Sequence, residues 1–235
     1  MPTTPEGFTR RLNELGDRLA DQGDLVLQMV EGGFDHLFTP GHEGLTALQA
    51  AEDSVDKADV AIERLSVALL GDATEAAARL SDDELRRVLT IVKVNNELER
   101  IADAALSCAT LGQRLADCGT APPNTFRVLT NSVVGIVRDA TKALTTGDAR
   151  LARIVLQSDD AVEAFKATLV RDAEAKLRSN QLDAHAAFIL LEIATATHTI
   201  AEHAANIAEQ LLYLHTGVIV RHVEGKWQEI EVGGD

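Results

Sequence analysis

Acidic side chains recur four residues apart at two places in the first half of the sequence. Glu52 and Asp56 form one pair, and Glu99 and Asp103 form the other. On a helix, residues four apart lie on the same face, one turn above each other. Two such pairs on facing helices would gather four carboxylates, and oxygen-rich clusters of this kind suit Mg²⁺, Ca²⁺, Mn²⁺ or iron. The spacing therefore marks these residues as candidate metal ligands.

A similar spacing occurs in the second half of the sequence. His198 and Glu202 are four residues apart, and a neutral imidazole is also a metal ligand. Asp159 and Glu163 are four apart as well. The alternative for both halves is an ordinary solvated helix face, because a chain with 37 Asp and Glu residues places carboxylates four apart by chance. Spacing alone leaves both interpretations open.

Other catalytic patterns are absent from the sequence. There is no glycine-rich nucleotide-binding loop, no H-E-x-x-H zinc motif and no G-x-S-x-G nucleophile motif. The Glu-x-x-His pair of ferritin-like di-iron bundles is also missing. We therefore expect a protein that is not an enzyme. The alternative is a carboxylate-rich metal-binding bundle that stores metal or acts as a metalloenzyme.

The composition argues against several kinds of partner. The chain has 235 residues, of which 46% are hydrophobic, and a formal net charge of −15. This charge repels nucleic-acid phosphates and anionic membrane surfaces, and it favours cations or basic partners. No apolar run approaches the ~18 residues of a membrane-spanning helix, because the most apolar stretch, 186–214, is broken by Glu192, Glu202 and Glu209. We therefore expect neither nucleic-acid binding nor membrane insertion.

Two cysteines bear on the cellular compartment. Cys108 and Cys118 lie ten residues apart on one expected helix, about 15 Å along its axis, which is too far for a disulfide. We interpret them as reduced, mostly buried thiols. Free thiols, together with an N-terminus that has no apolar signal core, are typical of a cytoplasmic protein.

The elements that would position the acidic pairs are long helices. Apart from two prolines near the start, the chain has proline only at Pro40, Pro122 and Pro123, so long tracts permit uninterrupted helices. Apolar residues recur at helical rather than strand spacing. We expect six helices, over residues 6–38, 44–70, 81–118, 123–145, 148–178 and 183–215.

Local signals set the expected helix ends. Gly32 and Gly33 are expected to fray the first helix near its end, and Gly71-Asp72 is expected to close the second. Ser81 followed by Glu84 predicts a capping box at the start of the third helix. The β-branched residues after Gly217 leave three options for the tail, a short strand, a hairpin or an extended arm.

The second half of the chain repeats the plan of the first. The segment 52–56 resembles 159–163, and the segment 99–103 resembles 198–202. Each trio of helices ends at a clear break, the first of them Gly119 to Pro123. We therefore predict an all-α fold of two tandem three-helix bundles, formed by internal duplication. The expected boundaries are residues 1–120 for the first bundle, 121–217 for the second and 218–235 for a C-terminal tail.

The two repeated segments resemble the signatures of the PhoU family of phosphate-transport regulators. Ile91 to Asp103, with the core Glu-Arg-Ile-Ala-Asp, resembles the first signature, whose core is Glu-Arg-Ile-Gly-Asp. His198 to Glu209 resembles the second, Glu-Arg-Ile-Gly-Asp-His-x-x-Asn-Ile-Ala-Glu. The resemblance covers nearly the whole chain and is specific, because both signatures fall in register with six helices and the duplication.

The resemblance implies a cytoplasmic, non-catalytic regulator that forms a homodimer. Members of this family are thought to connect a phosphate ABC transporter to a membrane-bound sensor histidine kinase, and so to restrain phosphate uptake and phosphate-starvation gene expression. A related subgroup accompanies phosphate/cation symporters, which is an alternative role for this chain.

The resemblance also implies metal clusters, of iron or of other cations such as Mn, Mg or Zn. Carried over to this sequence, the first site uses Glu99 and Asp103 with Glu52 and Asp56. The second uses the residues at equivalent positions of the second repeat, with Asn206 as a further candidate: Asp159, Glu163, His198 and Glu202.

This chain departs from the family signatures at several positions. Ala102 and Ala201 stand where the family has glycine. In the second signature, His198 stands for Glu, Thr199 for Arg and Glu202 for Asp, so the second site takes either a softer cation such as zinc or none. The first signature keeps its arginine, at position 100, which we interpret as a salt-bridge partner of a neighbouring carboxylate, with contact to a partner protein as the alternative.

Overall fold

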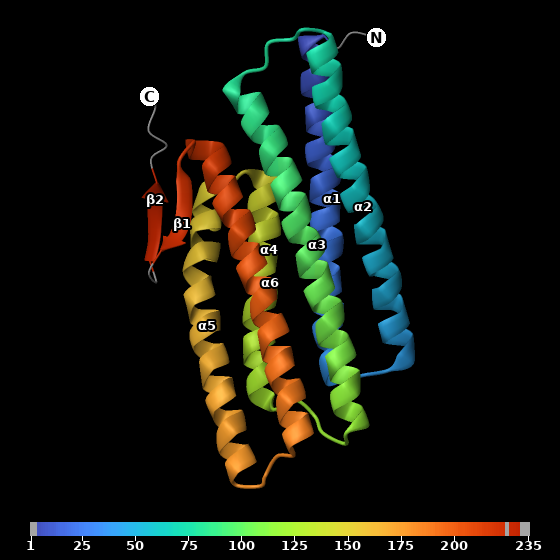
Figure 1. Ribbon diagram of the computed structural model, residues 1–235, viewed down its shortest axis with the longest axis vertical. Coiled ribbons are helices and arrows are strands. Elements are labelled where there is room, and N and C mark those ends of the chain that lie inside the picture. The colour runs from blue at the N-terminus through green and yellow to red at the C-terminus, as the bar shows by residue number, and fades with distance from the viewer. Residues whose placement is uncertain (1–3, 224–225, 231–235) are drawn as a thin grey trace.

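Six long helices account for most of the computed structural model, which describes residues 4–223 and 226–230 (Figure 1). The helices are α1 (Pro5–Phe38), α2 (His42–Glu75), α3 (Asp82–Asp117), α4 (Asn124–Thr146), α5 (Ala149–Arg178) and α6 (Ala184–Thr216). Two short strands follow, β1 (Ile219–Val223) and β2 (Lys226–Ile230). The predicted all-α class and the six predicted helices are confirmed.

Helices α1, α3, α5 and α6 begin at residues whose side chains accept free backbone N–H groups, whereas α2 and α4 begin without a side-chain cap. The predicted capping box is present: the Glu84 backbone N–H donates to Ser81 Oγ at 3.3 Å, and the Ser81 backbone N–H donates to Glu84 Oε2 at 2.8 Å. Asp148 and Asp183 accept backbone N–H groups in the same way at the starts of α5 and α6. These caps explain why the predicted starts of α3, α5 and α6 lie within one residue of the observed ones.

The expected end of the second helix is wrong, because α2 continues through Gly71 and Asp72 to Glu75. A glycine inside a helix costs only about 1 kcal/mol, and contacts with α1 offset that cost. Asp72 Oδ2 accepts a hydrogen bond from Arg11 Nη1 at 2.5 Å, and Ala73 is buried. Packing between the helices therefore extends α2 by about one turn.

The expected fraying at Gly32 and Gly33 is also wrong, because α1 is continuous to Phe38. Gly33 allows α1 to approach α3 closely: a Cβ at this position would lie 2.7 Å from the carbonyl oxygen of Ala105. Gly112 of α3 does the same from the other side, since its Cβ would lie 2.7 Å from Cα of Leu37. These glycines serve close helix packing rather than a turn.

Helices α3 and α6 occupy the centre of the molecule, with α2 and α5 at opposite edges (Figure 1). Each trio packs together, and the two trios join where α3 meets α6 and where α1 meets α4. The contact of α3 with α6 is the most extensive between any two elements of the described chain. One hydrophobic core includes side chains from all six helices. The predicted boundaries between the two bundles and the tail, at residues 120 and 217, stay a prediction.

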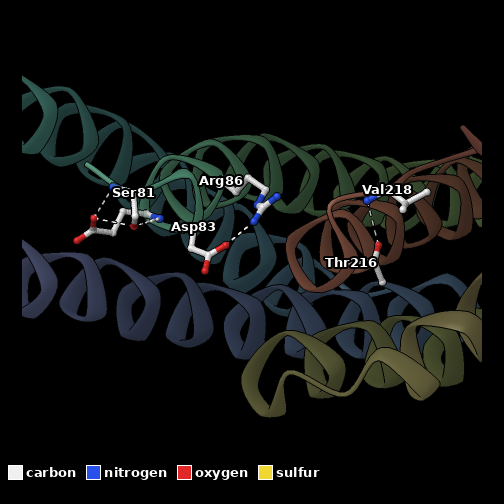
Figure 2. A network of polar contacts seen from close by, with 6 residues as sticks. Ser81, Asp83, Arg86, Thr216 and Val218 are labelled. Atoms are coloured by element: carbon white, nitrogen blue, oxygen red, sulfur yellow. Dashed lines mark hydrogen bonds and ion pairs between the residues drawn. The ribbon is translucent and has the colours of Figure 1, made fainter. Parts of the chain in front are cut away.

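The start of α3 lies beside the end of α6 (Figure 2). Arg86 forms an ion pair with Asp83 and approaches Gly217, where a Cβ would lie 2.9 Å from Arg86 Nη1. Gly217 has φ +71°, and its backbone N–H closes α6 by donating to the Tyr213 carbonyl. Glycine therefore meets both the left-handed conformation and the close approach of Arg86 at this turn.

The tail forms a hairpin, one of the three options that the sequence left open. Strands β1 and β2 pair antiparallel, with Ile219 opposite Ile230 and Val223 opposite Lys226. Residues 224–225 between the strands, and 231–235 after them, lie outside the described residues.

The composition of α6 departs from the expectation that no stretch of the chain is apolar enough to span a membrane. By length and composition it is apolar enough to cross a membrane, with a mean hydropathy of 1.3 over an 18-residue window, although half of that window is buried. A helix packed on several sides by α3, α4 and α5 needs apolar residues around most of its circumference. Its composition is therefore accounted for by its central position.

The two cysteines differ in their surroundings. Cys108 is fully buried, and burial raises the pKa of its thiol to about 12. Cys118 is exposed, so the expectation of a buried thiol is confirmed for Cys108 and wrong for Cys118. The difference follows from position, because Cys118 lies at the C-terminal cap of α3, where the helix leaves the core.

Candidate functional site

The four first-half candidates come together where α2 packs beside α3. Burial raises the pKa of Glu52, and Asp56 and Asp103 raise it further by repulsion. Burial likewise raises the pKa of Glu99, with a further contribution from Asp103. Carboxylates of two helices thus repel one another across the α2–α3 contact. The four side chains therefore lie near enough to interact electrostatically across this contact.

The acidic cluster extends one turn further than the sequence motifs indicated. Burial raises the pKa of Asp59, and repulsion from Glu63 and Asp56 adds to this. Asn95, only 2% exposed, holds Asp59 in place by donating from Nδ2 to its Oδ1 at 2.5 Å and to its backbone carbonyl at 3.1 Å. The sequence offered one signal for Asp59, which is that it follows Asp56 by three residues, a spacing that makes the two neighbours on a helix. We call Glu52, Asp56, Asp59, Glu99 and Asp103 the acidic cluster.

The donor groups of the acidic cluster fit a hard cation, since they are carboxylates whose repulsion a positive charge would relieve. As the side chains stand, no three Asp, Glu, His or Cys residues in the described part of the chain lie close enough to hold one metal ion. Side-chain rotation would be needed to close around a cation. Metal binding by this cluster stays a prediction.

The second-half candidates lie on α5 and α6, which pack against each other. Asp159 and His198 are partly buried, whereas Glu163 and Glu202 are exposed. The fold therefore places the two pairs on neighbouring helices, as the duplication predicted. Their capacity to bind a metal also stays a prediction.

A polar link between α3 and α6 was missed by reasoning from the sequence. His203 Nδ1 lies 2.6 Å from Glu97 Oε2, and Asn206 Nδ2 donates to the same oxygen at 3.0 Å. Burial favours the neutral acid, but the hydrogen bonds from His203 and Asn206 outweigh it and lower the pKa of Glu97. Asn206, a candidate ligand of the second site, is thus engaged by Glu97. Only the pairing of α3 with α6 reveals this link.

Arg100 lies beside the acidic cluster without an ion-pair partner among the described residues, so the expected salt bridge is wrong. Its charge acts at longer range and helps to lower the pKa of Glu97, although it contributes less than the hydrogen bonds from His203 and Asn206. The guanidinium instead lines a groove between α3 and α6. Arg100 is exposed, and its contact with a partner protein stays a prediction.

Two stretches of the chain, residues 19–111 and 126–211, match the PhoU domain. The chain belongs to the PhoU family. The two matches fall on the two helix trios, in agreement with the predicted duplication.

Curated PhoU proteins align with this chain over most of its length. It is 26% identical to the phosphate-specific transport system accessory protein PhoU homolog of Pseudomonas putida, over 97% of this chain and 88% of that protein. It is 24% identical to PhoU homolog 1 of Thermotoga maritima, over 89% of each. The family assignment therefore concerns the whole chain rather than one segment.

Solved PhoU structures share the fold. The crystal structure of PhoU from Pseudomonas aeruginosa superposes with a TM-score of 0.82 at 25% identity, over 89% of this chain and 99% of that one. The phosphate transport system regulatory protein PhoU from Streptococcus pneumoniae has the same TM-score at 21% identity, over 91% and 99%. The arrangement of six helices is thus that of PhoU proteins.

The PhoU signatures lie on the two central helices. Links from Glu97 to His203 and from Arg114 to Glu192 show that α3 and α6 run antiparallel. Ala102 and Ala201, which replace the signature glycines, are 1% and 0% exposed. Both methyl groups therefore fit within the packed centre of this PhoU protein, and the replacement does not prevent the central helices from packing.

Proposed function

We propose that this chain regulates phosphate transport as an accessory protein of a phosphate transporter. The observation that carries the proposal is the match of both helix trios to the PhoU domain, together with curated relatives named as phosphate-specific transport system accessory proteins. Each relative aligns over nine-tenths or so of this chain.

In finer detail, we propose an adaptor that works by protein contact and not by catalysis. It acts in the cytoplasm, as a homodimer, between a phosphate ABC transporter and a sensor histidine kinase. The absence of nucleotide-binding and nucleophile motifs from the sequence supports a non-catalytic role. The net charge of −15 supports contact with basic partner surfaces.

A deletion experiment tests this function. In cells that encode the chain, its removal is expected to change phosphate uptake and phosphate-starvation gene expression, and the intact chain is expected to restore both. Affinity capture with the transporter ATPase and with the kinase then tests the adaptor role. Unchanged uptake after deletion, with neither partner captured, would show that the proposal is wrong.

We also propose that the acidic cluster binds iron, Mn, Mg or Zn. The support is the proximity of carboxylates from α2 and α3, because burial and, after it, repulsion between them raise the pKa of Glu52, Asp59 and Glu99. A bound cation would offset this repulsion and join the two helices. The second-half residues are proposed as a further site on α5 and α6.

Elemental analysis of untagged protein tests the metal proposal. We expect roughly stoichiometric metal in the wild type and its loss in a Glu99→Gln/Asp103→Asn variant. An Asp17→Asn/Asp21→Asn variant is the matched control. It also removes two carboxylates that are four residues apart on one helix, in this case α1. Equal metal content in all three proteins, or none after incubation with each of the four metals, would refute the site.

A further inference from the structure

A pocket of about 480 Å³ lies where the edge helix α2 meets the two central helices α3 and α6 (Figure 1). Helix α2 contributes Asp59 and Glu63, α3 contributes residues between Val92 and Glu97, and α6 contributes Gln210. The volume is within the range of small-molecule sites, about 300–1,000 Å³. We call this the α2–α3–α6 pocket, and it has helices of both trios in its wall.

Two buried amide side chains in this pocket have polar atoms without a hydrogen-bond partner. Asn95, 2% exposed, donates from Nδ2 to Asp59, and its Oδ1 has no partner among the described residues. Gln210, 8% exposed, makes no side-chain hydrogen bond within the described part of the chain. Buried polar groups normally have partners. Because an amide oxygen can only accept, the group missing at Asn95 is an N–H or O–H donor.

The other acceptors in the pocket are carboxylates, and two of them are held in place. Asn206 donates to Glu97 Oε2, and His203 lies 2.6 Å from the same oxygen. Asp59 is held by the two hydrogen bonds from Asn95. Carboxylates that are already fixed lose little freedom when a ligand binds, and charged donors form the strongest hydrogen bonds with them.

The charges in the lining favour a ligand with two positive groups. Three carboxylates, those of Asp59, Glu63 and Glu97, stand against one ammonium group, that of Lys93, so the formal charge of the lining is −2. Lys93 is exposed, and its flexible side chain can extend into water. At pH 8 histidine is ordinarily neutral, so His203 leaves this balance unchanged. A singly charged group, such as a lysine side chain of a partner, would neutralise only half of it.

The spread of the acceptors separates an organic dication from a metal ion. A metal ion needs several oxygen ligands within about 2.0–2.6 Å of one point. In the residues that the structure describes, no three Asp, Glu, His or Cys side chains are close enough for that. The acceptors of the pocket come instead from three helices. Two ammonium groups on one flexible chain, with three N–H donors each, can reach separate acceptors.

We propose that the α2–α3–α6 pocket binds a linear diamine, a small organic cation with a primary ammonium group at each end. One ammonium group donates to Asn95 Oδ1 and the Asp59 carboxylate, and the other donates to Glu97 and Gln210. The methylene chain lies against Val92. This ligand lies beyond the proposed regulatory function and does not depend on it, so failure of either leaves the other standing.

The test uses the full chain in buffer with EDTA at pH 8 and roughly 0.15 M salt, where long-range attraction between exposed charges is screened. The probe is 1,4-diaminobutane. The matched ligand is 1-aminobutane, which has the same carbon chain and one ammonium group fewer. Isothermal titration calorimetry measures both Kd values. We expect one diamine per chain, bound at least tenfold more tightly than the monoamine.

Two variants that remove acceptors place the diamine in the pocket. Glu63→Gln should weaken binding at least fivefold, whereas Glu75→Gln, at an exposed α2 residue outside the lining, should not. Gln210→Met should weaken binding at least threefold. Its matched control is Gln22→Met, because Gln22 is also buried, at 2% exposed, and also has side-chain atoms without a partner in the described chain, yet lies outside the pocket.

A third variant tests the sign of the charge effect. Lys93→Met removes the one positive side chain of the lining and should tighten diamine binding at least twofold. Lys142→Met changes the net charge equally at an exposed position on α4 and should change the Kd less. Because Lys93 and Glu63 are both exposed, their replacement should leave the fold intact, so these results remain interpretable if a buried variant fails to fold.

The Glu99→Gln/Asp103→Asn variant separates the pocket from the acidic cluster. Both residues lie outside the lining, so diamine binding should change less than threefold. Four results would overturn the proposal: no binding of the diamine, equal binding of diamine and monoamine, equal effects of pocket and control variants, and a loss in Glu99→Gln/Asp103→Asn as large as that in Glu63→Gln. The last result would assign the diamine to the acidic cluster.

Discussion

Replacement of Gly112 by alanine should destabilise the fold even though alanine is the better helix former. In an open helix interior, glycine to alanine stabilises by about 1 kcal/mol. At Gly112 the new Cβ would lie 2.7 Å from Leu37 Cα and 3.2 Å from its carbonyl oxygen. Because these are backbone atoms, α1 and α3 must move apart, and overpacking of this kind costs about 1–3 kcal/mol.

The contact at Gly112 is severe, so we take the upper part of that range. The net effect is then about 2 kcal/mol of lost stability, which lowers Tm by about 4–8 °C for a chain of this length. The control is Gly135→Ala in α4, where no atom lies within 4 Å of the new Cβ. That variant should raise Tm by about 2–4 °C, so the two substitutions should differ in sign.

Thermal unfolding followed by circular dichroism at 222 nm, with wild type and both variants side by side, measures these shifts. The decisive quantity is the sign of the change at Gly112. A Tm for Gly112→Ala equal to or above that of wild type would show that α1 and α3 are not held together at this distance, and the account of the glycines as close-packing positions would fail.

Three further predictions concern the polar groups. Glu97→Ala should reduce stability by about 2–3 kcal/mol in urea unfolding at neutral pH, because it leaves His203 and Asn206 without their acceptor. Since the folded-state pKa of Glu97 is lowered, the part of this difference that comes from its ionised form should be lost as the pH falls through that pKa. Glu99→Gln should raise Tm at pH 7 in metal-free buffer, because burial and then Asp103 raise the pKa of Glu99, so that its ionised form opposes folding. The gain should vanish at acidic pH, and a gain that persists there would contradict this cause. Cys118 is exposed and should react with a thiol reagent in the native protein, whereas Cys108 is buried with a pKa of about 12 and should react only after unfolding. Equal labelling rates for the two thiols in the native protein would disprove the burial of Cys108.

Local signals in the sequence predicted the six helices and most of their ends. Caps such as Ser81 with Glu84 act within one turn, so their effect can be recognised without tertiary structure. Gly71 and Gly33 misled for the opposite reason. Each reads as a helix end when taken alone, and only contacts with a neighbouring helix, such as that of Arg11 with Asp72, keep the backbone helical there.

The candidate site was predictable only as far as one helix face extends. Glu52 with Asp56, and Glu99 with Asp103, follow from the spacing within each helix. The participation of Asp59 through Asn95, and the link of Glu97 with His203, depend on how far one helix is shifted along another. That shift is set by side-chain packing over the whole contact, and the spacing within a single helix carries no information about it.

Because α3 and α6 are antiparallel, the duplication bears on the direction in which a bound segment can lie along their contact. Two repeats with identical residues on antiparallel helices would present the same surface after a half-turn, and an occupant would fit equally well in either orientation. Here Arg100 has Thr199 as its counterpart, and Glu99 has His198. These replacements remove the equivalence of the two ends, so the duplicated fold of this chain has a defined polarity.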